Sequence, residues 1–168
     1  LDALDSPRAT DVALDVLVRE SDPRVRRAAV FAIPEPQGTS AADAQRVVAT
    51  LGRAAQFDVD PELRRRAVIQ LGAWHHTTAD LAPVLRLLAA DPSVDVRAGA
   101  AFALEVAVRR EPSVLSALAR AMNDRGEDSL VRHNAWRALG RLGPLPDSIA
   151  RDYATFASEA ARTEGGKP

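Results

Sequence analysis

Histidines are the first residues to consider as catalytic or metal-binding groups, because the chain of 168 residues contains three of them and no cysteine. His75 and His76 are adjacent, so on a helix their side chains point about 100° apart and cannot hold one metal ion together. His133 stands alone, and no H-E-x-x-H motif occurs, which leaves no recognisable set of zinc ligands. We therefore expect no bound metal and no cofactor.

Groups for nucleophilic or acid–base catalysis are equally hard to assemble from this sequence. No G-x-S-x-G motif presents a serine nucleophile, and Gly165 and Gly166 near the end of the chain do not form a phosphate-binding loop. Carboxylates gather near the N-terminus, where they predict a solvated acidic face: Asp2, Asp5, Asp11, Asp15 and Glu20. The sequence therefore indicates a protein that is not an enzyme.

Charge and length narrow the class of protein further. Lysines and arginines number 22 and aspartates and glutamates 23, giving a formal net charge of −1. This balance argues against a general nucleic-acid coat protein or a peptide of the membrane surface. The apolar runs are too short for a membrane span or a secretory signal, and we expect a cytoplasmic protein. The length suits one domain over residues 1–162, with a tail at residues 163–168.

The elements that must position any site are revealed by an internal repeat. Four segments align without gaps: Val25–Ile33, Leu63–Leu71, Val96–Leu104 and Val131–Leu139. Each begins with an aliphatic residue and an arginine, and each has alanine four places on and an aliphatic residue eight places on. These positions form one stripe of a helix, and no strand alternation is sustained.

Cap and breaker residues predict where these helices begin and end. A carboxylate precedes a proline or serine at each start, in Asp22-Pro23, Asp60-Pro61, Asp91-Pro92 and Asp128-Ser129. Gly72 and Gly140 are expected at helix ends. Further amphipathic helices are predicted between the repeated ones, at about Thr10–Glu20, Ala41–Phe57, Thr78–Ala90 and Pro112–Asn123, and a last one at Pro146–Ala161. The stretch Pro34–Ser40 is predicted to be a loop.

This pattern, D-P-x-V-R-x-x-A-x-x-A-L-G, resembles HEAT repeats, in the short form known from phycobilisome lyases. The units that match best are Asp22–Ile33, Asp60–Gly72 and Asp128–Gly140. In the third unit Asp91 and Pro92 stand two residues too early, which predicts an extra turn at the start of that helix. The resemblance implies an all-α fold, a right-handed α-solenoid of stacked antiparallel helix pairs, and it is nearly silent on chemistry.

The repeated arginines lie beside the apolar stripe and predict a ladder that ties the repeats together. Its members are Arg26, Arg64, Arg97 and Arg132, with Asp22, Asp60 and Asp128 four residues earlier as the expected partners. A row of arginines that binds phosphates is the alternative. Of the two tryptophans, Trp74 is predicted to be in the core, and Trp136 to cover a seam between repeats.

The resemblance implies that the second helix of each pair lines a concave face. Residues on the side away from the stripe are then candidates for binding a partner: Arg27, Phe31, Arg65, Ile69, Phe102, Arg109, His133, Arg137 and Arg141. Basic groups beside a row of apolar residues predict a scaffold that binds an acidic or amphipathic segment of a partner protein. Nucleic-acid binding or DNA repair, and an accessory subunit of a lyase, are the alternatives. The apolar row could instead seal contacts between repeats.

Overall fold

The protein is a row of helices. The computed structural model describes residues 6–36, 39–74, 80–107 and 109–164, and within these ranges it has nine α-helices and no strand. They are α1 (Ser6–Arg19), α2 (Pro23–Ala32), α3 (Ala41–Phe57), α4 (Pro61–Trp74), α5 (Ala82–Ala90), α6 (Val94–Ala107), α7 (Pro112–Asn123), α8 (Ser129–Arg141) and α9 (Asp147–Glu164). The predicted all-α fold with four helix pairs and a last single helix is confirmed.

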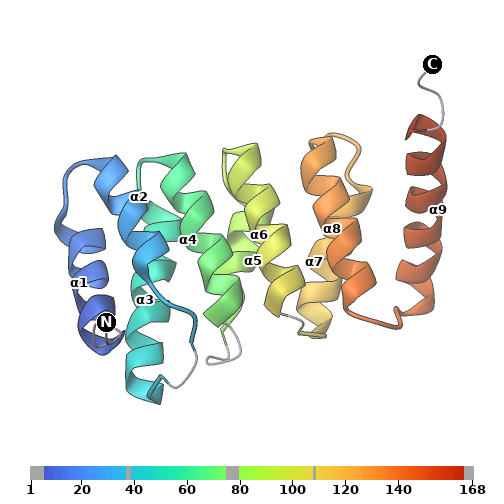
Figure 1. Ribbon diagram of the computed structural model, residues 1–168. Coiled ribbons are helices and arrows are strands. Elements are labelled where there is room, and N and C mark those ends of the chain that lie inside the picture. The colour runs from blue at the N-terminus through green and yellow to red at the C-terminus, as the bar shows by residue number, and fades with distance from the viewer. Residues whose placement is uncertain (1–5, 37–38, 75–79, 108, 165–168) are drawn as a thin grey trace.

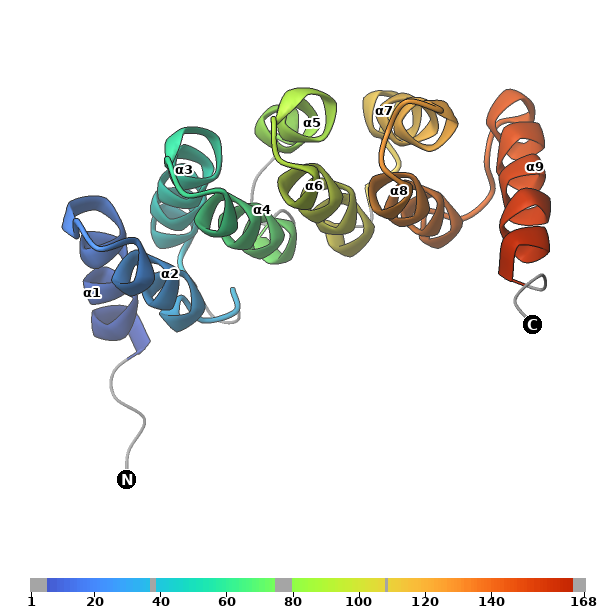
Figure 2. The ribbon, with the colours of Figure 1, turned by 90° about the horizontal axis from the view of Figure 1, so that it is seen from above.

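The pairs stack side by side into a curved solenoid. Within each pair the two helices pack against each other, and α2, α4, α6 and α8 pack in sequence along one layer. Seen from above, the row is bent, and this layer lies on the inner, concave side while α3, α5 and α7 lie on the outer side (Figures 1 and 2). The last helix, α9, contacts α7 and α8 and covers the end of the row.

All four second helices begin in the same register. Each of α2, α4, α6 and α8 starts two residues before the first aliphatic residue of its stripe, which is Val25, Leu63, Val96 or Val131. The expected extra turn in the third unit is therefore wrong. The Asp91 carboxylate instead accepts a hydrogen bond from the backbone N–H of Ser93 (2.9 Å), so it lies in the turn before α6.

The apolar stripes form one continuous core. Leu63, Val96, Val131 and the predicted core residue Trp74 are completely buried, because every interior stripe is enclosed by its own pair and its neighbours. Burying aliphatic side chains in this way is the main stabilising contribution in a repeat array.

Two glycines have a different role from the predicted one. Gly72 and Gly140 lie inside α4 and α8, and neither ends its helix. A Cβ atom at Gly72 would stand 2.8 Å from the backbone of Ala103 in α6, so this glycine permits close approach of two helices. Gly143, with a φ of +85°, is the residue that adopts a left-handed conformation after α8.

Most helix bounds agree with the prediction. The bounds of α3 and α7 are those predicted, whereas α5 begins at Ala82 rather than at Thr78, and α9 extends to Glu164. Thr78 and the predicted surface histidines His75 and His76 lie outside the described residues, as do residues 165–168 of the predicted tail.

The repeated arginines form a ladder, with partners different from the predicted ones. Arg26 binds Asp58 through two hydrogen bonds of 2.9 Å, and Arg64 binds Asp91 in the same way. Each arginine thus joins its own repeat to the turn before the second helix of the next repeat. We call the three pairs Arg26–Asp58, Arg64–Asp91 and Arg97–Glu127 the arginine ladder; in the last, both bonds measure 2.7 Å.

The ladder carboxylates are fixed from two sides. The carboxylate of Asp58 also accepts from the backbone N–H of Asp60 (2.9 Å), and the backbone carbonyl of Asp58 accepts from Arg64 (3.0 Å). Burial raises the pKa of the Asp58 carboxyl, but the hydrogen bonds from Arg26 and from the backbone outweigh burial and lower it. The contacts therefore run without interruption from one repeat to the next.

The predicted carboxylate partners have other contacts. Asp22 caps α2 and pairs with Arg24, and Asp128 caps α8. Asp60 forms an ion pair with Arg27 (2.7 Å). The predicted partners are wrong because the guanidinium groups, which point along the stack as the sequence suggested, reach the turn of the next repeat and not the carboxylate four residues earlier. At the end of the row, Arg132 donates to the carbonyl of Met122 (3.0 Å) and lies over the ring of Phe156.

Candidate protein-binding groove

A groove crosses the concave face where α4, α6 and α8 lie side by side. Its volume is about 490 Å³. It is lined by Glu62, Arg65 and Ile69 of α4, by Asp95, Ala98, Gly99 and Phe102 of α6, and by Leu130, Asn134 and Arg137 of α8. We call this set the concave groove. Four of the predicted partner-binding residues, Arg65, Ile69, Phe102 and Arg137, therefore meet in one place.

The floor of the groove exists because α6 has small residues there. A Cβ atom at Gly99 would lie 3.3 Å from side-chain carbons of Arg65 and Val68, so α4 approaches this part of α6 closely. On the other side, the side-chain amide of Asn134 donates to the backbone carbonyl of Ala98 (3.1 Å). The three helices are thus held at a fixed spacing, and the groove is already formed without a partner.

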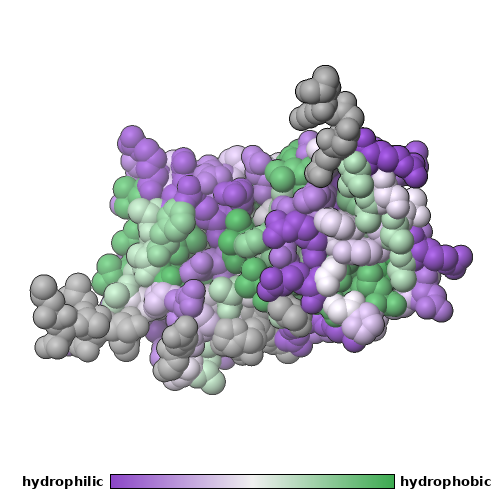
Figure 3. Space-filling view, turned by 45° about the vertical axis from the view of Figure 1, so that its right-hand side comes forward, coloured by the Kyte–Doolittle hydropathy of each residue, from purple (hydrophilic) through white to green (hydrophobic). Residues whose placement is uncertain are grey.

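The rim of the groove has charges of both signs. Arg65, with 41% of its side chain exposed, lies 3.6 Å from Glu62. Arg137, with 45% exposed, donates to the buried carboxylate of Glu105 (3.2 Å). With Asp95 the lining has two carboxylates and two guanidinium groups, so it is balanced in charge rather than basic. Hydrophobic and hydrophilic residues are likewise interspersed on the surface seen in Figure 3.

The other predicted partner-binding residues lie outside this groove. Phe31 on α2 is 69% exposed, and the guanidinium of Arg66 lies over its ring at 4.2 Å. Arg27 pairs with Asp60 between the first two repeats. Arg109 pairs with Glu111 after α6 (2.7 Å), and Arg141 is exposed at the end of α8.

His133 belongs to a second hollow, between α8 and α9. There it lies 5.4 Å from the ring of Trp136, which in turn stacks on Tyr153 of α9 at 5.4 Å. Phe156 completes this aromatic cluster. Trp136 therefore covers the junction between the last pair and α9, as the sequence predicts for a seam.

Comparison with known proteins identifies the repeat. The model of the HEAT repeats family matches residues 10–105 and 81–151, most of the chain. The chain belongs to the HEAT-repeat family. Comparisons with curated proteins and with solved structures give no match. HEAT repeats serve in general as protein-interaction scaffolds with extended concave surfaces. The finer resemblance to phycobilisome lyases is not part of this result.

The sequence prediction missed six of the ten residues that line the groove. Glu62, Asp95 and Leu130 each stand one residue before the stripe begins, which is one helical turn before the position of Arg65. Because residues three apart share a helix face, this position of each HEAT repeat lies on the same side of the helix as Arg65 and belongs among the candidate partner-binding positions. Asn134 lies on the side of α8 that faces α6, so its role depends on the spacing between helices.

Two kinds of site, a metal site and a membrane span, bear on the function of the described part of this HEAT-repeat chain. No group of three or more histidine, cysteine, aspartate or glutamate residues there could hold a metal ion. None of the helices in the described ranges is long and apolar enough to cross a membrane. What the concave groove offers is apolar contact, ion pairing and hydrogen bonding.

Proposed function

We propose that the concave groove binds an amphipathic segment of a partner protein and catalyses no reaction on it. The observation that supports this function is the convergence of three apolar side chains, Ile69, Phe102 and Leu130, from three consecutive repeats. Leu130 is 47% exposed, and the other two are partly exposed. An apolar centre with a charged rim is typical of a protein interface, and a preformed groove lowers the ordering cost of binding.

The balance of charge favours an amphipathic partner over a uniformly acidic one. Arg65 and Arg137 can each take a carboxylate of the partner, but Glu62 and Asp95 repel a run of acidic residues. A partner helix with an apolar stripe in the middle and charges of both signs at its sides satisfies all four groups. Nucleic acid fits less well, because phosphates would face two carboxylates.

Charge reversal at Arg65 tests this proposal. Its partner in the structure is Glu62 at 3.6 Å on a half-exposed surface, so Arg65→Glu should change the free energy of unfolding by no more than about ±0.5 kcal/mol. Affinity for the partner should fall about tenfold, chiefly through slower association. The measurement is cross-linking capture from native lysate, with captured proteins quantified by mass spectrometry for each variant.

Arg86→Glu is the matched control, because Arg86 lies on α5 of the outer layer and donates to Gln56 (3.0 Å). It should capture the same proteins as the wild type. If Arg86→Glu abolishes capture while Arg65→Glu has no effect, the outer surface carries the function and the concave groove does not.

A second variant tests the apolar centre. Phe102→Ala should cost about 1–3 kcal/mol of stability, since the ring is only partly buried. It should also weaken capture of the partner at temperatures well below the melting temperature of the variant, where the variant is still folded. Fluorescence anisotropy with a DNA duplex at low salt should show no binding. Binding that declines steeply with salt would instead indicate phosphate contacts and contradict the protein-binding proposal.

A further inference from the structure

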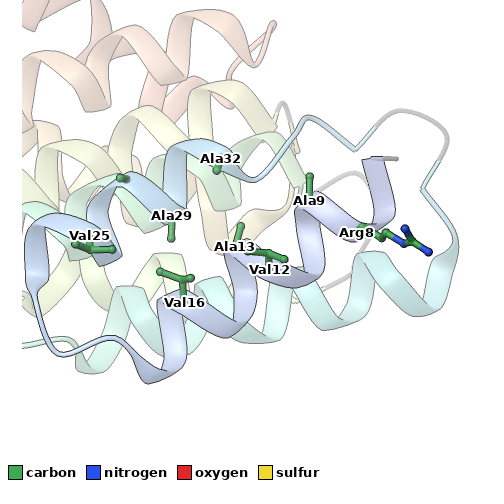
Figure 4. Close-up of a pocket in the computed structure, with 9 residues that line it drawn as sticks. Arg8, Ala9, Val12, Ala13, Val16, Val25, Ala29 and Ala32 are labelled. Atoms are coloured by element: carbon green, nitrogen blue, oxygen red, sulfur yellow. The ribbon is translucent and has the colours of Figure 1, made fainter. Parts of the chain in front are cut away.

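The first helix pair exposes an apolar face at the end of the row. Between α1 and α2 lies an open groove of about 600 Å³, lined almost entirely by valine and alanine side chains (Figure 4). Val12 is 64% exposed and Val25 is 42% exposed. Exposed contiguous apolar surface of this kind marks an interaction site.

The other repeats show what covers this face. Val25 is the first stripe residue of α2, and its counterparts Leu63, Val96 and Val131 are completely buried. They are enclosed because a preceding helix pair packs on that side, as α2 packs on α4, α4 on α6 and α6 on α8. The face of α1 and α2 is therefore a repeat seam with one side missing in the described part of the chain.

Glu20 gives a second, independent indication. Like the ladder carboxylates Asp58 and Asp91, it stands five residues before the stripe and accepts hydrogen bonds from backbone N–H groups of its turn (2.7 and 3.0 Å). Its backbone carbonyl accepts from Arg26 (3.1 Å), as that of Asp58 does from Arg64. Asp58 and Asp91 each also bind the arginine of the preceding repeat, whereas no arginine of the described residues reaches the Glu20 carboxylate.

We propose that the exposed face of α1 and α2 is a stacking surface for a further helix pair of the HEAT type, in the register of the other four. The second helix of that pair would lay its aliphatic residues over Val12 and Val25 and direct an arginine to Glu20. This surface lies at the end of the row and is separate from the concave groove.

A second copy of the chain matches these requirements less well. Its opposite end is covered by α9, whose exposed side chains include Arg151, Ser158 and Arg162. A polar helix surface offers neither the aliphatic contact that the groove needs nor a ladder arginine, because Arg132 is held by Met122 and Phe156. The geometry thus favours a helix pair over self-association.

The test adds such a pair to the intact chain. A second copy of residues 80–111, which contain α5 and α6, is placed before the full chain, because α6 already directs Arg97 to a glutamate. The melting temperature should rise by about 5 °C or more, and amide exchange in α1 and α2 should slow on the order of tenfold. The same residues added after α9 should give neither effect.

Two substitutions show whether the added pair uses the proposed contacts. In the extended chain, Glu20→Gln should remove roughly 3 °C or more of the gain through loss of the arginine contact, whereas Asp95→Asn on the concave face should not. Val12→Glu should remove most of the gain but leave the unextended chain equally stable, because Val12 is exposed there.

Two outcomes would overturn the proposal. In the first, the added pair changes neither the melting temperature nor the exchange of α1 and α2. In the second, light scattering shows that the unextended chain is a dimer that Val12→Glu separates, which would assign the face to a second copy.

Discussion

The close approach of α4 and α6 predicts that replacing one glycine by alanine destabilises the protein while replacing another stabilises it. In Gly72→Ala the new Cβ would meet Cα and O of Ala103 at 2.8 Å. Both are backbone atoms, so no rotamer change relieves the contact. In Gly52→Ala, by contrast, the new Cβ would have no atom within 4 Å apart from its own stretch of the α3 backbone. The two substitutions therefore share their chemistry and differ in what surrounds them.

The expected magnitudes follow from two opposing contributions. Gly to Ala in a helix gains up to about 1 kcal/mol from backbone conformational freedom. At Gly72, restoring an ordinary contact distance requires α4 and α6 to separate by about 0.6 Å, and overpacking of this kind costs about 1–3 kcal/mol. We expect Gly72→Ala to destabilise by about 1–2 kcal/mol, since the propensity gain is small in the last turn of α4. Gly52→Ala should stabilise by about 0.5–1 kcal/mol.

Urea and thermal unfolding followed by far-ultraviolet circular dichroism measure both values. At about 2–4 °C per kcal/mol for a chain of this size, the two melting temperatures should move in opposite directions from that of the wild type. A Gly72→Ala variant as stable as the wild type, or more stable, would refute the reasoning. It would mean that the α4–α6 spacing adjusts freely and does not fix the width of the concave groove.

Two further predictions concern the arginine ladder. Arg64→Met leaves the nearly buried carboxylate of Asp91 without its cation and should cost about 3 kcal/mol or more in urea unfolding, whereas Arg46→Met, which breaks only exposed pairs, should cost less than about 1 kcal/mol. Equal losses would contradict the structural role of the ladder. Hydrogen bonding from Arg97 lowers the pKa of the Glu127 carboxyl below its ordinary value of 4.5, so this pair should stabilise the fold above pH 4.5 and lose its contribution as the pH falls below that value. As the pH is lowered from 6 to 3, the urea concentration at the midpoint of unfolding should decline less in Glu127→Gln than in the wild type. An equal decline in the two proteins would refute this role of the Arg97–Glu127 pair.

The arginines of the ladder could be predicted from the sequence, but their partners could not. Arg26, Arg64 and Arg97 each follow the first aliphatic residue of a stripe, and the helical period of the stripe shows on which side of the helix they lie. Both features can be read within a single repeat. The carboxylates lie 27 to 32 residues further on, and only the packing of consecutive pairs decides which one is reached. Asp91 resembles a helix cap in sequence, yet in the structure it is the counterpart of Asp58.

The groove shows the same division between local and distant information. The directions of Arg65, Ile69 and Phe102 follow from helix geometry, so the sequence places them on one face. Whether such residues converge depends on the distance between helices, which Gly99 and Asn134 determine through contacts with the neighbouring repeat. The sequence predicts basic groups beside an apolar row, and the structure adds two carboxylates from the preceding turn, Glu62 and Asp95, so the lining of this groove is balanced in charge.

The ladder has a consequence for the order in which the protein folds during synthesis. Every ladder bond joins residues no more than 32 positions apart, so no early segment must wait for the end of the chain. A ribosome adds that many residues in about 2–6 s, whereas helical chains with such local contacts fold in about microseconds to milliseconds. Each helix pair can therefore dock on its predecessor as soon as its second helix has emerged, without waiting for later repeats. Folding then proceeds from the N-terminus, one repeat at a time, at the pace of translation.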